Sequence, residues 1–190
     1  MSRTAGGTDG GRIAASAGIG VLVAAIGYLL TTLLMRDEVR ENLENFAEWK
    51  GTAWYYFSAH FVELERSGSV GGISGTDTIN LISESGSANA DLLYAIPPVV
   101  LLFAGALLAY RLDVHDLGSA VVAGAPVALG YGVVMSLGAI VVESSREGAV
   151  WGIDASGSMA PALLPAVVLA GILYPLVFAT AGAVLTSALR

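Results

Sequence analysis

Four long runs of apolar residues dominate the chain and predict membrane-spanning helices. Each run is close to or longer than the roughly 20 helical residues that a hydrocarbon core about 30 Å thick requires. The runs are continuous, whereas the strands of a membrane barrel would alternate polar and apolar residues. They cover residues 13–35, about 92–110, 117–142 and about 159–189. The pattern predicts an all-α, four-transmembrane-helix bundle in which residues 1–190 form a single membrane domain.

The first run is predicted to be a retained anchor, because its length exceeds the 7–15 apolar residues of a cleaved signal sequence. The chain is expected to be a multi-pass protein of the cell membrane. Basic residues are denser near the two chain ends and between the second and third runs than in 36–91 and 143–158. This distribution favours cytoplasmic N- and C-termini. Arg36 and Arg40, directly after the first run, favour the opposite orientation.

The sizeable segment outside the runs, residues 36–91, is expected on the extracellular side. Within it, residues 37–66 carry helically spaced apolar positions, and seven of the chain's 15 aromatic residues lie between Phe46 and Phe61. Because tryptophan and tyrosine favour the headgroup level, this part is predicted to be an amphipathic, aromatic-rich helical segment on the membrane interface. Its possible contacts with a partner or with lipid are Trp49, Lys50, Trp54, Tyr55, Phe57, His60 and Phe61. Residues 67–90, rich in glycine and serine, predict a loop with one short strand or helical turn.

Composition supports a membrane protein and excludes several other classes. Hydrophobic residues make up 55% of the chain and charged residues 13%, whereas an average soluble domain has about 25% charged residues. A net charge of −7 would repel nucleic-acid phosphates, so no nucleic-acid partner is expected. Without cysteine there is no disulfide or thiolate metal site. The acidic, lysine-poor exterior is typical of a protein bathed in concentrated salt, with an ordinary acidic loop as the alternative.

Small residues recur every four positions along the third run and predict a close contact between helices. In lipid, helices associate through close van der Waals fit, which small side chains permit. The stripe consists of Ala120, Gly124, Ala128, Gly132 and Ser136. The third helix is therefore expected at the centre of the bundle, with a homodimer contact as the alternative use of the stripe.

The sequence predicts no catalytic, cofactor-binding or metal site. The four runs contain no Asp, Glu, Lys, Arg or His, the residues that mark proton relays and ion paths in membranes. Residues 158–161 resemble the Ser-Met-x-Pro box of type I signal peptidases, but no lysine or histidine follows to act as the base. Ser158 is better explained as the N-cap of the fourth helix. His60 and His115 are expected at opposite membrane faces, which excludes a shared metal site.

Two sequence motifs resemble a family of small, uncharacterised haloarchaeal membrane proteins. They are residues 49–62, WKGTAWYYFSAHFV, and residues 93–98, LYAIPP. The resemblance implies four spans and a halophilic archaeal origin. Some members of that family carry a transporter label, but the motifs imply no chemistry.

Two functions fit these patterns. The preferred one is a non-enzymatic envelope or interaction protein that uses segment 37–66 to contact lipid or a membrane protein partner. The alternative is a small transporter or channel subunit for a neutral solute or lipid, because broken helices can line transport sites. This alternative predicts a water-accessible cavity lined by the third and fourth runs.

Overall fold

Four helices long and apolar enough to cross a membrane form the body of the molecule. The computed structural model describes residues 6–150 and 153–190. The four helices cover Ile13–Asn42, Asn89–Arg111, Leu117–Val141 and Leu163–Ala188. Large apolar side chains point outward from them; the Leu33 side chain, for example, is 78% exposed. The predicted helices of membrane-spanning length are confirmed, and the outward apolar surface suits a lipid environment.

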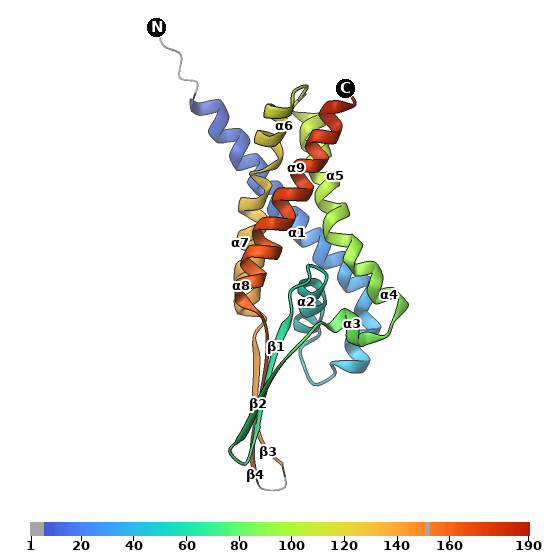
Figure 1. Cartoon of the computed structure of the whole chain (residues 1–190), viewed down its shortest axis with the longest axis vertical. Coiled ribbons are helices and arrows are strands. Elements are labelled where there is room, and N and C mark those ends of the chain that lie inside the picture. Colours follow the sequence, from blue (N-terminus) through green and yellow to red (C-terminus); the bar gives the residue numbers. More distant parts are fainter. Residues whose placement is uncertain (1–5, 151–152) are drawn as a thin grey trace.

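The two ends of the bundle differ. Helix α1 (Gly6–Asn42) begins, and helix α9 (Tyr174–Ala188) ends, at the same end of the bundle (Figure 1). A small β-sheet projects from the opposite end, which we call the sheet end. The second long helix begins there with α4 (Ala88–Asp91) and η1 (Leu92–Ala95) and continues as α5 (Ile96–Arg111).

Proline interrupts the third and fourth long helices. The third is divided into α6 (Leu117–Gly124) and α7 (Val127–Val141), with Pro126 immediately before α7. The fourth consists of α8 (Leu163–Pro165), a π-helical stretch η2 (Ala166–Leu173) and α9. Pro165 and Pro175 flank the π-helical stretch. Because proline lacks a backbone N–H, it removes one bond of the regular helical ladder.

Glycine lets the helix backbones approach one another. A Cβ atom added at Gly182 of α9 would collide with the backbone of Leu102 on α5, and one at Gly105 with the backbone of Ala179. Between α1 and α7, a Cβ at Gly20 would collide with the Val127 carbonyl oxygen. Helix α7 packs against α1, η2 and α9. Close van der Waals fit between small residues is the association mode available to helices in lipid.

Residues 37–66 form several elements, which corrects the expectation of one amphipathic helical segment. Helix α1 continues to Asn42, a turn follows, and α2 covers Glu48–Ser58 before the chain enters a strand at Leu64. Farther along, α3 (Leu81–Ser85) is capped by Asn80, whose side chain accepts hydrogen bonds from the backbone N–H groups of Ile82 and Ser83.

A four-stranded antiparallel sheet is the main departure from the all-α prediction. Its strands are β1 (Leu64–Val70), β2 (Ile73–Ile79), β3 (Ser144–Val150) and β4 (Ile153–Pro161), in the order β2-β1-β4-β3. Pairing of β1 with β4 joins two hairpins that come from segments far apart in the sequence. Ser158 lies in β4 and is no helix N-cap, and the fourth long helix begins at Leu163 rather than near residue 159.

Replacing Gly20 by leucine should destabilise the fold, because the new side chain would meet the Val127 carbonyl oxygen and, 2.7 Å from its Cβ, the Tyr131 backbone nitrogen. Overpacking of this kind costs about 1–3 kcal/mol. Gly18→Leu is the matched control, because nothing lies within 4 Å of a Cβ at Gly18. The temperature at which the detergent-solubilised protein loses its monodisperse size-exclusion peak should fall for Gly20→Leu alone. Equal melting of both variants would refute the close α1–α7 contact.

Candidate functional site

Helix α2 is enclosed at the sheet end of the bundle. Every residue from Gly51 to Ser58 is buried, and α2 packs against α1, α3 and β4. The Trp54 indole donates a hydrogen bond to the Val142 carbonyl oxygen at 3.2 Å, which ties α2 to the end of α7. The Trp54 ring also meets Phe46 edge-on, with ring centroids 4.9 Å apart. The aromatic residues of α2 therefore fill the sheet end of the bundle.

This placement corrects the expectation of an exposed aromatic surface. Four of the seven predicted contact residues are buried: Trp54, Tyr55, Phe57 and His60. Trp49 and Phe61 are exposed, and Lys50 is partly exposed. The aromatic side chains face inward, where α1 and α7 offer them apolar neighbours and where the Trp54 indole N–H finds the Val142 carbonyl oxygen as its acceptor.

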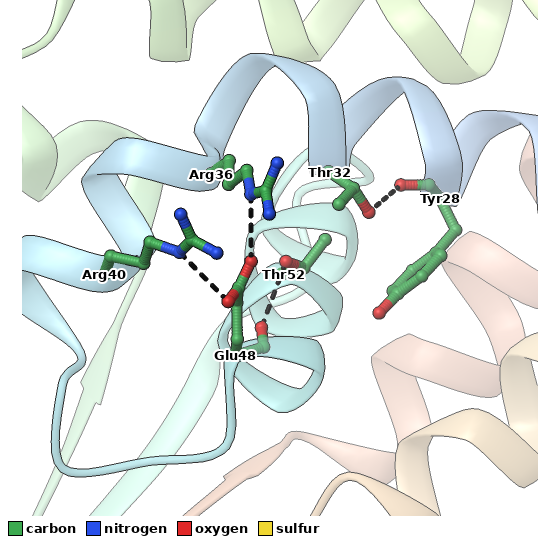
Figure 2. Close-up of polar contacts among 6 residues, drawn as sticks. All are labelled: Tyr28, Thr32, Arg36, Arg40, Glu48 and Thr52. Atoms are coloured by element: carbon green, nitrogen blue, oxygen red, sulfur yellow. Dashed lines mark hydrogen bonds and ion pairs between the residues drawn. The ribbon is translucent and has the colours of Figure 1, made fainter.

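Charged side chains hold the N-terminus of α2 against α1 (Figure 2). The Glu48 carboxylate lies 3.4 Å from Arg36 Nε and accepts a hydrogen bond from Arg40 Nε at 3.1 Å. Glu48 is in the first turn of α2, where a negative charge is favoured by the helix dipole. The Tyr28 hydroxyl donates to the Trp49 carbonyl oxygen at 3.1 Å. These partly exposed ion pairs contribute little stability; they connect the first turn of α2 to α1.

A chain of three polar side chains lies at the other end of α2. His60 Nδ1 is 2.7 Å from the Tyr56 carbonyl oxygen, His60 Nε2 is 2.7 Å from the Tyr131 hydroxyl, and the Tyr131 and Tyr56 hydroxyls are 2.6 Å apart. Because a carbonyl oxygen can only accept, Nδ1 must donate its proton to it. In a neutral imidazole, Nε2 then accepts from Tyr131, whose hydroxyl accepts in turn from Tyr56. The geometry thus assigns both the tautomer and the direction of the chain.

Burial keeps His60 and the Tyr56 hydroxyl of this hydrogen-bonded group uncharged at neutral pH. Desolvation lowers the pKa of His60 from 6.5 to about 4, although the hydrogen bond to the Tyr56 backbone opposes the shift. Desolvation likewise raises the pKa of the Tyr56 hydroxyl above its ordinary value, and raises that of Tyr55 to about 12. The rings of Tyr56, Tyr131 and Tyr174 surround the imidazole, with centroids 4.8, 5.9 and 5.0 Å from it.

A tight turn after His60 returns the chain toward the sheet. Phe61 has a φ of 58°, in the left-handed region that a bulky residue rarely adopts. Its ring stacks on Tyr94 with centroids 4.6 Å apart. The Val62 backbone N–H donates to the Phe57 carbonyl oxygen at 3.2 Å, which closes the turn. His60 can therefore stay inside while the chain leaves the bundle at Leu64.

An apolar cavity of about 410 Å³ lies between α1, α2 and α7. Its wall is formed on α1 and α2 by Ala24, Ala25, Tyr28, Leu29, Trp49, Ala53, Tyr56 and Phe57, and on α7 and just beyond its end by Val134, Met135, Gly138, Val141 and Val142. Two of the predicted contact residues, Trp49 and Phe57, belong to this wall. Phe57 is buried, whereas Trp49, at the N-terminus of α2, is exposed. The sequence alone does not predict this cavity, because its walls come from three separate elements.

The small-residue stripe of the third long helix lies partly in the contacts between this helix and the fourth long helix. Ala120 is buried, while Ala128 and Ser136 are partly exposed. A Cβ at Gly124 would come within 2.8 Å of the Ala179 carbonyl oxygen, and one at Gly132 within 2.7 Å of the Gly171 carbonyl oxygen. The two glycines of the stripe therefore face α9 and η2.

One feature of the sequence indicates the hydrogen-bonded group of Tyr56, Tyr131 and His60. Tyr131 is the only tyrosine in the third run, and a hydroxyl deep in an apolar helix needs a partner. The second histidine, His115, follows α5 in the turn before α6, exposed and 3.3 Å from Asp113 Oδ1. Within residues 6–150 and 153–190, no group of three potential metal-ligating side chains comes together.

Comparison with known proteins gives a family without an assigned role. One family model matches residues 1–190, and its description is a family of unknown function, DUF7978. Neither the comparison with curated proteins nor that with solved structures finds a match.

Acid should destabilise the protein through His60. Between pH 6.5 and about 4, the unfolded chain binds a proton at this imidazole that the folded chain does not bind, so stability falls as pH falls. Between pH 7 and pH 5 the loss should be roughly 2 kcal/mol. It should appear as a lower melting temperature in detergent that His60→Gln no longer shows.

His115→Gln is the matched control for this prediction, because it replaces the other histidine of the chain, which is exposed. If His60→Gln keeps the full pH dependence of the wild-type chain, the buried neutral imidazole is not its source.

Proposed function

The chain belongs to this family of unknown function, and from its own geometry we propose that it is a non-enzymatic interaction protein of the cell membrane whose sheet contacts a partner. The supporting observation is that the strands leave the bundle and are mostly exposed away from it. Leu64, Ile79 and Met159 at the base are buried, whereas all residues from Ile73 to Thr78 are exposed. A sheet normally buries at least one face. A sheet without a core of its own is suited to display or assembly.

Side-chain contacts between neighbouring strands help to hold the sheet in one conformation. Ser67 and Ser158 join β1 and β4 by a hydroxyl–hydroxyl hydrogen bond of 2.7 Å, and Ser69 and Ser156 by one of 2.8 Å. Arg66 pairs with Asp77 across β1 and β2 at 3.2 Å. The outer strands β2 and β3 are the edges of the sheet, and edge strands present backbone groups to which another chain can pair.

The exposed members of the predicted contact set flank the base of the sheet. Phe61 lies three residues before β1. Lys50 donates a hydrogen bond to the carbonyl oxygen of Glu143, the residue before β3. We include Trp49, Lys50 and Phe61 in the proposed contact surface, which extends from the sheet to the membrane interface. With both termini on the cytoplasmic side, as the distribution of basic residues favours, this surface faces the outside of the cell.

Photo-crosslinking at the sheet should capture the partner. A photoreactive amino acid in place of Ser74 or Ser145, both exposed, should give an adduct of one fixed mass in intact cells. An adduct of twice the mass of the chain would identify a second copy, and any other fixed mass a different protein. The photoreactive amino acid in place of Leu33, which is exposed among the apolar side chains of α1, should give no protein adduct. Failure to obtain a discrete protein adduct at either sheet position, or identical adducts at Leu33, would overturn the proposal.

One observation favours the alternative of a small transporter. The π-helical stretch η2 interrupts the fourth long helix, and π-helical turns occur often at functional sites. Five residues after Pro175, the Thr180 hydroxyl is enclosed and has no hydrogen-bond partner among the described residues. A water-filled path between α7 and α9 would satisfy that hydroxyl.

This alternative predicts that water-soluble thiol reagents reach the path. The chain has no cysteine, so Thr180→Cys would carry its only thiol. A membrane-impermeant methanethiosulfonate should label it in vesicles, while Thr31→Cys, buried on α1 with its hydroxyl bonded to the Gly27 carbonyl oxygen, stays unlabelled. An inert thiol at position 180 would count against the transporter.

A further inference from the structure

We propose that the cavity between α1, α2 and α7 binds one hydrocarbon chain of an anionic phospholipid of the surrounding membrane, with Lys50 contacting the lipid phosphate. This site goes beyond the proposed interaction of the sheet; the two share Trp49 and Lys50 at the start of α2, but a lipid in the cavity does not require a partner at the sheet, nor the reverse. It rests on the lining of the cavity, on its position along the membrane-length helices, and on the charge beside it.

The lining selects an apolar occupant. Nearly all of the exposed wall is carbon, contributed by side chains such as Leu29, Phe57 and Val134. A water molecule in a cavity needs two to four polar partners, and this wall offers almost none. The volume of about 410 Å³ falls within the range of roughly 300–1,000 Å³ that is usual for ligand sites.

The position selects lipid as the source of that occupant. The α1 wall, from Ala24 to Leu29, lies within the membrane-length helix Ile13–Asn42, and most of the α7 wall lies within Leu117–Val141. On both helices the neighbouring positions carry exposed apolar side chains, such as Leu33, Leu137 and Ile140. The cavity therefore opens onto a surface that hydrocarbon chains cover in a membrane.

The charge beside the cavity selects an anionic headgroup. Trp49 forms part of the wall, and the next residue, Lys50, is the only lysine of the chain. The Lys50 ammonium lies 5.5 Å from the centre of the Trp49 ring and donates one hydrogen bond to the Glu143 carbonyl oxygen. An ammonium has three donors, so two remain for a phosphate oxygen.

Neighbouring side chains leave this ammonium available. The adjacent carboxylate, Glu48, is engaged by Arg36 and Arg40 on the α1 side. Among the described residues, no carboxylate lies within ion-pair distance of Lys50 Nζ. An apolar cavity with the Lys50 ammonium over its Trp49 wall matches a phospholipid, in which a hydrocarbon chain and a phosphate are joined in the same molecule.

Native mass spectrometry of the full-length, detergent-solubilised chain tests the site. The probes are dioleoyl phosphatidylglycerol, which is anionic, and dioleoyl phosphatidylcholine, which has the same chains and no net charge. We expect one lipid per chain, with phosphatidylglycerol preferred about fivefold, the effect of one basic residue near an anionic headgroup. Equal binding of the two lipids by the wild-type chain would overturn the role of Lys50.

Two pairs of variants distinguish binding of the lipid hydrocarbon chain in the cavity from binding of the lipid headgroup at Lys50. Ala25→Phe places a ring in the cavity and should abolish binding of both lipids, whereas Ala14→Phe, on an exposed position of α1 outside the cavity, should not. Ala25→Leu is the milder variant if the phenylalanine impairs folding, as judged by size-exclusion chromatography. Lys50→Gln should bind the two lipids equally, and Lys50→Arg should keep the preference. Unchanged lipid binding by folded Ala25→Phe or Ala25→Leu would show that the cavity is not the site.

Discussion

The hydrogen-bonded chain from Tyr56 through Tyr131 to His60 is the interaction on which the arrangement at the sheet end depends. Inside a helix bundle, an unpaired hydroxyl or imidazole carries a desolvation cost of a few kcal/mol. Here each of the three groups satisfies the next, and the last donor ends on a backbone carbonyl oxygen. Helix α2 and the turn after it can therefore place Tyr56 and His60 inside the bundle, because these hydrogen bonds offset the desolvation cost of the polar groups. Gly27 is part of this arrangement, because a Cβ there would collide with the Tyr56 hydroxyl and displace its ring.

With α2 fixed, two further features are positioned. The N-terminal half of α2 forms one wall of the cavity, with Trp49 and Lys50 at its start. The turn after α2 directs β1 out of the bundle beside β4. Both proposed interactions, with a partner at the sheet and with a lipid at the cavity, thus depend on the same buried helix. The ion pairs of Glu48 are exposed by comparison and connect only the first turn of α2 to α1.

The sequence predicted the four long helices, because hydrocarbon imposes a length and a composition that can be counted directly. It did not predict the burial of α2, since Trp54 and its neighbours have the same amphipathic character in a headgroup layer as in an interior that offers a carbonyl acceptor. The first hairpin did leave a local signal: Gly71 and Gly72, both with positive φ, stand between two seven-residue segments, as in a two-residue hairpin turn. The β1–β4 ladder left none, because pairs such as Ser67 and Ser158 lie 91 positions apart.

The β1–β4 ladder also constrains the order in which the protein can be made. Strand β1 is synthesised before the second and third long helices, but its partner β4 follows both of them. A growing chain therefore carries the first hairpin with an open inner edge until the second and third long helices and β4 have left the ribosome. Only then can β4 add to that edge, and the start of the fourth long helix, two residues after β4, is placed in the same event. Completion of the sheet and seating of the last helix are in this sense one step of biogenesis.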